Sequence, residues 1–123
     1  MRRLAPQAGW LSEETADTDA RLSQRSLFVV DPIDGTSAFT RGDARWAVSI
    51  ALVEAGRPTL GVVHAPALRE TFSAAAGVGA FLNGAPLTAP IRTSLTGAKM
   101  IAPRPLHAQL EAAPQKVVLV PRV

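Results

Sequence analysis

Apolar positions along the chain fall into short runs separated by turn signals, which is typical of a sheet-rich fold. Residues 26–30 form an apolar run with β-branched and aromatic side chains and predict a buried strand. This strand is predicted to end at Asp31, because Pro32 cannot extend a central ladder. The preceding stretch, to about Gln24, is polar and acidic with weak periodicity, so we expect a loop there.

The middle of the chain predicts a series of antiparallel strands. Residues 46–53 alternate between two largely apolar faces, which is the period of a strand. Residues 55–58 supply turn chemistry and residues 59–64 resume a strand pattern, so this pair predicts a hairpin. Asn83-Gly84 is the strongest short hairpin signal in the sequence. The remaining predicted elements are strands at residues 70–75, 98–102 and 116–120 and a short helix at residues 106–112.

Length and composition describe an ordinary globular chain. With 123 residues, 47% of them hydrophobic and 19% charged, we expect one folding unit that buries a core. The absence of cysteine excludes disulfides, thiolate zinc sites and cysteine nucleophiles.

Charge and hydropathy narrow the classes of partner. The 13 basic residues are scattered rather than clustered, and aromatic residues make up only 5% of the chain, which disfavours nucleic-acid binding. No apolar run approaches the roughly 20 residues that span a bilayer, and the N-terminus lacks the apolar core of a secretory signal. We therefore expect no nucleic-acid or membrane partner and a cytoplasmic location.

A cluster of polar residues follows the first apolar strand, where active-site loops lie in sheet proteins. Asp31-Pro32-Ile33-Asp34-Gly35-Thr36 contains two carboxylates three residues apart, and in a turn both can point into one small space. Their like charge would then need a cation. Oxygen ligands favour a hard divalent ion, Mg²⁺ above all.

Gly35 and Thr36 add features of a phosphate site. Glycine allows close backbone approach, and a helix beginning at Thr36 would turn its free N–H groups toward an anion. Asp-Pro and Asp-Gly are also turn formers, and a bare Asp-Gly-Thr is more often a turn than a site. The whole hexapeptide is more specific than that tripeptide.

The hexapeptide, with Phe39 in the short helix expected after it, resembles the signature of the inositol monophosphatase family. Leu11-Ser12-Glu13-Glu14 matches the Glu-Glu motif of the same family, with Ser where many members have Gly. The resemblance extends from about Trp10 to Leu87. It includes the family's later hairpin segments in order and spacing, at residues 48–52, 56–58, 61–63, 65–66, 77–80 and 83–84.

This resemblance implies an α/β fold of the sugar-phosphatase type, layered as α+β around an antiparallel sheet, with Mg²⁺-dependent, lithium-sensitive phosphatase activity. It implies that Glu13, Asp31, the main-chain carbonyl of Ile33 and Asp34 ligate the metal, with Mn²⁺ as the alternative to Mg²⁺. Thr36 would orient the attacking water together with Glu13, and the Gly35 and Thr36 amides would hold the substrate phosphate. Such hydrolysis needs an activated water and cancelled charge on the transferring group, which clustered metal ions supply.

Two features of the family are missing from the 123 residues. Few residues precede Glu13, where the family has a helical segment. Trp occurs only at Trp10 and Trp46, and neither precedes Asp, so the family's later Trp-Asp-x-Ala motif and its second α/β region are absent. We therefore expect a fragment, one incomplete domain over residues 1–123, with impaired activity. The alternative is a non-catalytic remnant or a metal- or phosphate-binding module of the same family.

The substrate expected from the resemblance is a small phosphate monoester. The Leu-Ser-Glu-Glu form is similar to the 3′(2′),5′-bisphosphate nucleotidase branch, whereas the hairpin segments suit an inositol monophosphatase equally. The expected partner is this phosphorylated substrate, and a full-length protein is compatible with a homodimer.

Overall fold

The computed structural model describes residues 5–16, 19–89, 91, 93–102, 104–114 and 116–120. The chain divides into two compact units, residues 1–88 and residues 89–123. In the described residues, no helix has the length and apolar character needed to cross a membrane. That residues 1–123 form one incomplete domain stays a prediction.

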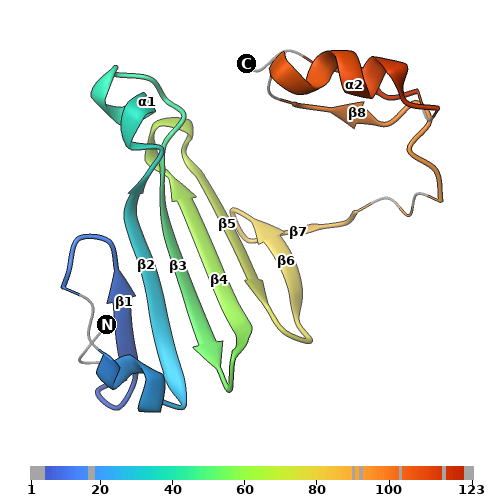
Figure 1. The fold of residues 1–123 in the computed structure, drawn as a ribbon. Helices are drawn as coiled ribbons and strands as arrows, with labels where there is room; N and C mark the ends of the chain where they lie inside the picture. Colours follow the sequence, from blue (N-terminus) through green and yellow to red (C-terminus); the bar gives the residue numbers. More distant parts are fainter. Residues whose placement is uncertain are drawn as a thin grey trace. The chain divides into compact units, whose positions relative to one another are not determined.

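The first unit is built on a mixed sheet whose seven strands lie side by side in chain order (Figure 1). Each neighbouring pair from β2 to β7 is antiparallel, and β1 joins β2 in parallel. The predicted antiparallel sheet is therefore confirmed, with a parallel strand added at one edge. The strands are β1 (Gly9–Ser12), β2 (Ser26–Asp34), β3 (Ala47–Glu54), β4 (Arg57–Ala65), β5 (Glu70–Ala75), β6 (Gly79–Leu82) and β7 (Ala85–Leu87).

The N-terminal stretch is not the loop that its polarity predicts. It contains β1 and the 3₁₀ helix η1 (Asp19–Ser23), so the prediction of a loop to about Gln24 is wrong. Trp10 and Leu11 give β1 apolar side chains, and β1 pairs with β2 from Gly9 opposite Leu27 to Ser12 opposite Val30. Parallel strands are joined by a longer crossover connection and not by a two-residue turn, so no short turn motif in the sequence marks the pairing of β1 with β2.

Strand β2 continues through Pro32 to Asp34, so the predicted end at Asp31 is also wrong. Asp31 pairs with Ser49 and Asp34 pairs with Ala47, and the register shifts between these two positions. Pro32 lies within this irregularity and has no paired residue on β3, so the N–H that proline lacks is not needed for the sheet. The two carboxylates therefore lie on one strand, on either side of a bulge.

Helix α1 (Thr36–Thr40) begins at the predicted residue. Gly35 precedes it with φ 87°, and its carbonyl accepts hydrogen bonds from the N–H groups of Ala38 and Phe39 at 2.8 and 3.1 Å. The ring of Phe39 meets that of Trp46 edge to face, with centroids 4.9 Å apart. This contact holds α1 against the start of β3.

Both predicted hairpins are confirmed. Ala55 and Gly56 join β3 to β4 and have positive φ angles of 48° and 76°, as a two-residue turn requires. Asn83 and Gly84 join β6 to β7 in the same conformation, at 49° and 82°. The side-chain oxygen of Asn83, Oδ1, also accepts a hydrogen bond from the Thr71 N–H at 2.9 Å.

The second unit is small. Its strands β8 (Lys99–Met100) and β9 (Val118–Leu119) pair in parallel, and the helix α2 (His107–Ala112) follows the 3₁₀ helix η3 (Arg104–Leu106). The predicted strands and helix are present with narrower bounds.

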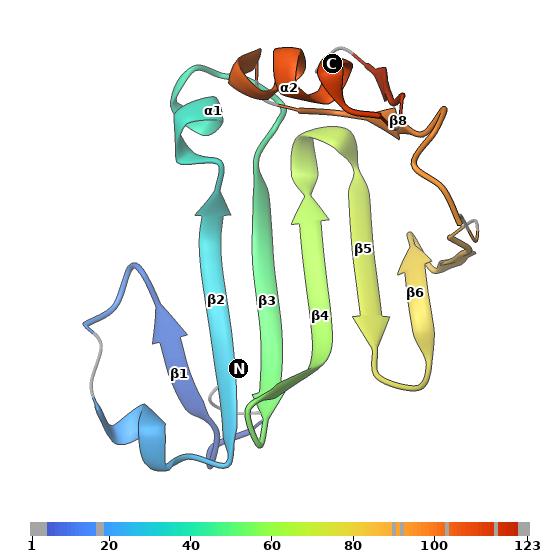
Figure 2. The same cartoon turned by 45° about the vertical axis from the view of Figure 1, so that its right-hand side comes forward.

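The sheet carries apolar side chains on both faces but buries few of them. Among the described residues the buried apolar side chains are Val30, Ala38 and Ala65. Figure 2 shows β2 to β5 side by side. Directly paired residues share a face; we call the face with Asp31, Ser49, Val63 and Phe72 the carboxylate face.

Candidate active site

A tight turn after β1 places Glu13. The Ser12 hydroxyl accepts a hydrogen bond from the Glu14 N–H at 3.4 Å, and the Ser12 carbonyl accepts one from the Thr15 N–H at 3.2 Å. The Trp10 indole N–H donates to the Thr15 hydroxyl at 3.2 Å. Ser12 is buried, so the turn is fixed at its base while the Glu13 side chain is exposed at its tip.

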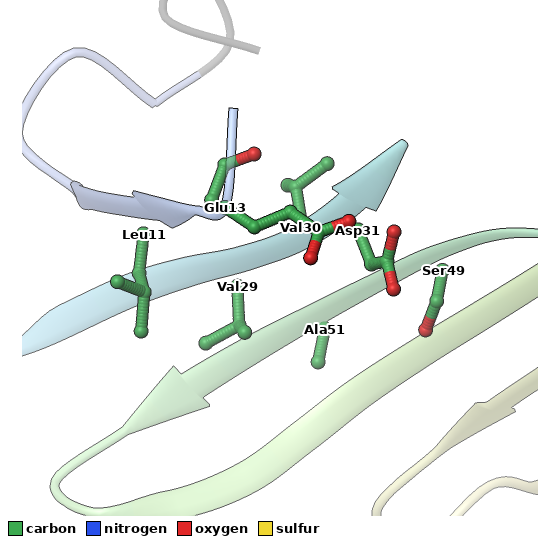
Figure 3. Close-up of a pocket in the computed structure, with 8 residues that line it drawn as sticks. Leu11, Glu13, Val29, Val30, Asp31, Ser49 and Ala51 are labelled. Atoms are coloured by element: carbon green, nitrogen blue, oxygen red, sulfur yellow. The ribbon is translucent and has the colours of Figure 1, made fainter. Parts of the chain in front are cut away.

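The parallel pairing of β1 with β2 places Asp31 beside Glu13. One Asp31 carboxylate oxygen, Oδ1, accepts the Ile33 N–H at 3.0 Å. The parallel pairing of Ser12 with Val30 brings the residues that follow them into proximity. Figure 3 shows the Glu13 side chain extending over β2 toward the Asp31 carboxylate.

The two carboxylates perturb each other. Repulsion by Asp31, together with a hydrogen bond to it, raises the pKa of Glu13, and burial, Glu14 and Asp34 add smaller effects in the same direction. The charged groups that act on Glu13 are thus carboxylates. Such a concentration of negative charge is suited to a cation.

Glu13 and Asp31 face a hollow of about 230 Å³ between β1, β2 and β3. At about 30 Å³ for each water, this hollow has room for several water-sized groups. Ser49 is a further polar side chain at its edge (Figure 3). The other residues that line it are Leu11, Ser12, Val29, Val30 and Ala51.

The rest of the hexapeptide lies at the end of β2. Asp34 is exposed opposite Ala47 and does not line the hollow. The Thr36 hydroxyl donates to the Ile33 carbonyl at 3.0 Å. Across the described ranges, no three carboxylate or imidazole groups lie close enough together to hold a metal ion.

The donor set fits a hard cation. Glu13 and Asp31 offer carboxylate oxygens, and the Ile33 carbonyl offers a main-chain oxygen on the same bulge. Mg²⁺ and Mn²⁺ prefer such ligands to sulfur or imidazole. Two carboxylates that face one another without a basic partner among the groups acting on Glu13 also favour a cation between them.

A sequence profile of the inositol monophosphatase family matches residues 1–115. The chain belongs to the inositol monophosphatase family. Its identification from the hexapeptide and the Glu-Glu motif is therefore confirmed.

Individual family members match only with part of their length. Nus factor SuhB of Xylella fastidiosa is 38% identical over 117 residues, which cover 90% of this chain and 42% of that protein. The 3′(2′),5′-bisphosphate nucleotidase CysQ of Salmonella typhimurium is 41% identical over 78 residues, 63% of this chain and 32% of that protein. Among solved structures, the Thermotoga maritima IMPase TM1415 has a TM-score of 0.74 at 31% identity, covering 96% of this chain and 47% of that one. The chain thus spans less than half the length of each.

The structure brings some of the predicted site residues of this family member together. Glu13 and Asp31 share the hollow, and Ile33 and Thr36 are joined by a hydrogen bond. The four residues from Ile33 to Thr36 do not line the hollow, and the roles of all the predicted site residues stay predictions. Ser49 also lines the hollow, and the sequence does not single it out, because a single serine in an apolar strand has no distinctive spacing.

Proposed function

We propose that the chain carries the cation- and phosphate-binding part of the active site of a phosphatase that hydrolyses small phosphate monoesters. The observation that carries this proposal is the meeting of Glu13 and Asp31 in one hollow at the start of the hexapeptide. Membership of the inositol monophosphatase family supports it.

Four groups would hold the cation: the carboxylates of Glu13, Asp31 and Asp34 and the carbonyl of Ile33. Asp34 lies outside the hollow, so its carboxylate would have to turn toward the other two when the cation binds. A bound Mg²⁺, or Mn²⁺ in its place, would neutralise charge on the phosphate and lower the pKa of a water molecule. The oxygen-only donor set supports this choice of metal. The irregular register between Asp31 and Asp34 supports their joint use. On a regular strand, residues three apart face opposite sides of the sheet, whereas a bulge can turn both side chains toward the same side.

Glu13 and Thr36 are the proposed catalytic residues. The Thr36 hydroxyl donates a hydrogen bond to the Ile33 carbonyl, so the lone pairs of its oxygen can accept a hydrogen bond from water. Glu13 can accept a second hydrogen bond from the same water, and together they would orient it toward the phosphorus. No covalent bond to the protein is needed.

The amides of Gly35 and Thr36 are the proposed phosphate contacts. They precede the first hydrogen bond of α1, which the Ala38 N–H donates to the Gly35 carbonyl. They therefore remain available to an anion. Gly35 permits this approach because it has no side chain and adopts a positive φ.

The substrate is proposed as a 3′(2′),5′-bisphosphate nucleotide or an inositol monophosphate, the classes in the names of the nucleotidase and the IMPase relatives. A second candidate function is metal or phosphate binding without turnover. It is favoured by the site itself, because no three carboxylate or imidazole groups of the described residues lie close enough together to hold a metal ion.

Phosphate release from inositol 1-phosphate and adenosine 3′,5′-bisphosphate tests the proposal. We expect little release by the 123-residue chain alone. A chimera in which this chain replaces the aligned part of the Thermotoga maritima IMPase should release phosphate only with Mg²⁺ or Mn²⁺. In this chimera Asp31→Asn and Glu13→Gln should each lower the rate by about 100-fold or more.

Glu54→Gln is the matched control, because Glu54 lies at the far end of β3 and accepts a hydrogen bond from Thr59 at 2.8 Å. An active chimera whose rate is unchanged by Asp31→Asn would contradict the proposed site. An inactive chimera that still binds the metal would favour the non-catalytic alternative.

A further inference from the structure

Strand β3 presents one hydroxyl among apolar side chains. From Ala47 to Val53 the only polar side chain is that of Ser49, which is the direct cross-strand partner of Asp31. Paired residues on antiparallel strands have Cβ atoms about 4.5–5.5 Å apart, so Ser49 and Asp31 are neighbours on the carboxylate face. Ser49 also lines the hollow that Glu13 and Asp31 share (Figure 3).

Apart from Asp31, the neighbours of Ser49 on the carboxylate face offer no polar side chain with which its hydroxyl could form a hydrogen bond. Its partner on β4 is Val63, and Ala51 is the next residue of β3 on the same face. Within the described residues the Ser49 hydroxyl has no hydrogen-bond partner, Asp31 included, so this donor is uncommitted. Valine or alanine would suit a strand position with such neighbours at least as well.

The Asp31 carboxylate can accept a further hydrogen bond from this hydroxyl. Its Oδ1 atom accepts the Ile33 N–H, and Glu13 hydrogen-bonds to the same carboxylate, but the two oxygens of a carboxylate together offer about four acceptor sites. A hydrogen bond from Ser49 to Oδ2 would fix the second oxygen of a carboxylate whose first oxygen the bulge already fixes. Groups that orient ligand side chains in this way commonly raise metal affinity by about 10–100-fold.

We propose that Ser49 is a positioning residue of the cation site: when the cation is bound, its hydroxyl donates to the Asp31 carboxylate and holds it toward Glu13. This inference rests on the cation site proposed above. It adds to that site a residue from β3, so that three neighbouring strands would contribute to one cation.

The affinity for Mn²⁺, measured from the electron paramagnetic resonance signal of the free ion, tests this role. Threonine and valine have nearly the same shape, so Ser49→Thr and Ser49→Val differ mainly in that only the threonine keeps a hydroxyl. Ser49→Val and Ser49→Ala should weaken Mn²⁺ binding by about 10–100-fold, and Ser49→Thr should stay within about 3-fold of the unaltered chain. Ser73→Ala is the control and should change nothing, because Ser73 pairs with Val62 and Phe81 on the opposite face.

The outcomes separate this inference from the proposed site. If the unaltered chain binds Mn²⁺ and Asp31→Asn weakens binding while Ser49→Val does not, the role of Ser49 is wrong and the cation site stands. Equal losses in the Thr and Val variants would show that Ser49 matters for packing only, which also overturns the inference. No binding by the unaltered chain would overturn both.

Discussion

Two glycines flank α1 at the residue scale, and only one of them is crowded. Gly35 and Gly42 both have positive φ angles, of 87° and 70°. A Cβ on Gly35 would lie 2.8 Å from the Arg45 carbonyl oxygen, whereas one on Gly42 would meet nothing within 4 Å. Alanine at either position adds backbone strain of about 1–2 kcal/mol, but only Gly35→Ala also forces the backbone apart.

We therefore predict that Gly35→Ala loosens α1 more than Gly42→Ala does. The amides of Ala38 and Phe39 bond to the Gly35 carbonyl and report on this directly. Their hydrogen exchange should be about 10-fold faster in Gly35→Ala than in Gly42→Ala. Equal exchange rates in the two variants would contradict the crowding at Gly35.

Asp43 and Arg45 form an ion pair in the loop between α1 and β3. Hydrogen bonds from the Arg45 side chain and backbone lower the pKa of Asp43 from 3.8 to about 2. Because the folded pKa lies below the unfolded value, the pair stabilises the loop above about pH 4, and this stabilisation is lost as the pH falls toward 2.

An NMR titration of the Asp43 carboxyl carbon should accordingly show a pKa of about 2. Arg45→Gln should return this pKa toward 3.8, and Arg57→Gln, in the β3–β4 hairpin, should leave it unchanged. A pKa near 3.8 in the unaltered chain would refute the pairing.

At the scale of elements, α1 is held to the sheet by aromatic contact. Phe39 and Trp46 form an edge-to-face pair, and such pairs contribute about 0.5–1.5 kcal/mol beyond their buried area. Phe39→Leu should speed exchange of the Ala38 amide by roughly 2–10-fold. Phe72→Leu on β5 is the control, and an equal effect of both variants on that amide would count against the contact.

The hairpins and the helix start could be predicted because their signals are local. Asn83-Gly84 fixes a turn, and Gly35-Thr36 fixes a helix start, whatever the rest of the chain does. Strand β1 could not be predicted, because its stability comes from a parallel partner across η1. The continuation of β2 through Pro32 depends likewise on a register shift against β3 that the local sequence does not reveal.

The candidate site shows the same division. Glu13, Asp31 and Thr36 could be predicted because they belong to motifs with recognisable spacing. Ser49 became visible only through its pairing with Asp31, since a single serine in an apolar strand has no distinctive spacing. A role that depends on strand register is therefore proposed from the structure, whereas a role that depends on a motif is proposed from the sequence.

At the scale of the whole molecule, the described residues bury few of their apolar side chains. Among them no side chain is less than 2% exposed, and large apolar residues such as Phe72 and Val63 on the carboxylate face remain 37% and 38% exposed. Apolar surfaces of this kind favour association.

We predict that the isolated 123-residue chain unfolds over a broad temperature range, binds a hydrophobic dye and aggregates as its concentration rises. Scanning calorimetry and dye fluorescence would check this. A sharp, reversible transition of a monomer would contradict it.

The most direct test of the cation site is a calorimetric titration of the chain with Mg²⁺. We predict saturable binding that Asp31→Asn and Glu13→Gln each weaken by about 10-fold or more, since each removes a charged ligand. Glu111→Gln, in α2 of the second unit, should leave binding unchanged. Absence of Mg²⁺ binding, or binding that is equally strong in Asp31→Asn, would contradict the assignment of Glu13 and Asp31 to a metal-dependent phosphatase site.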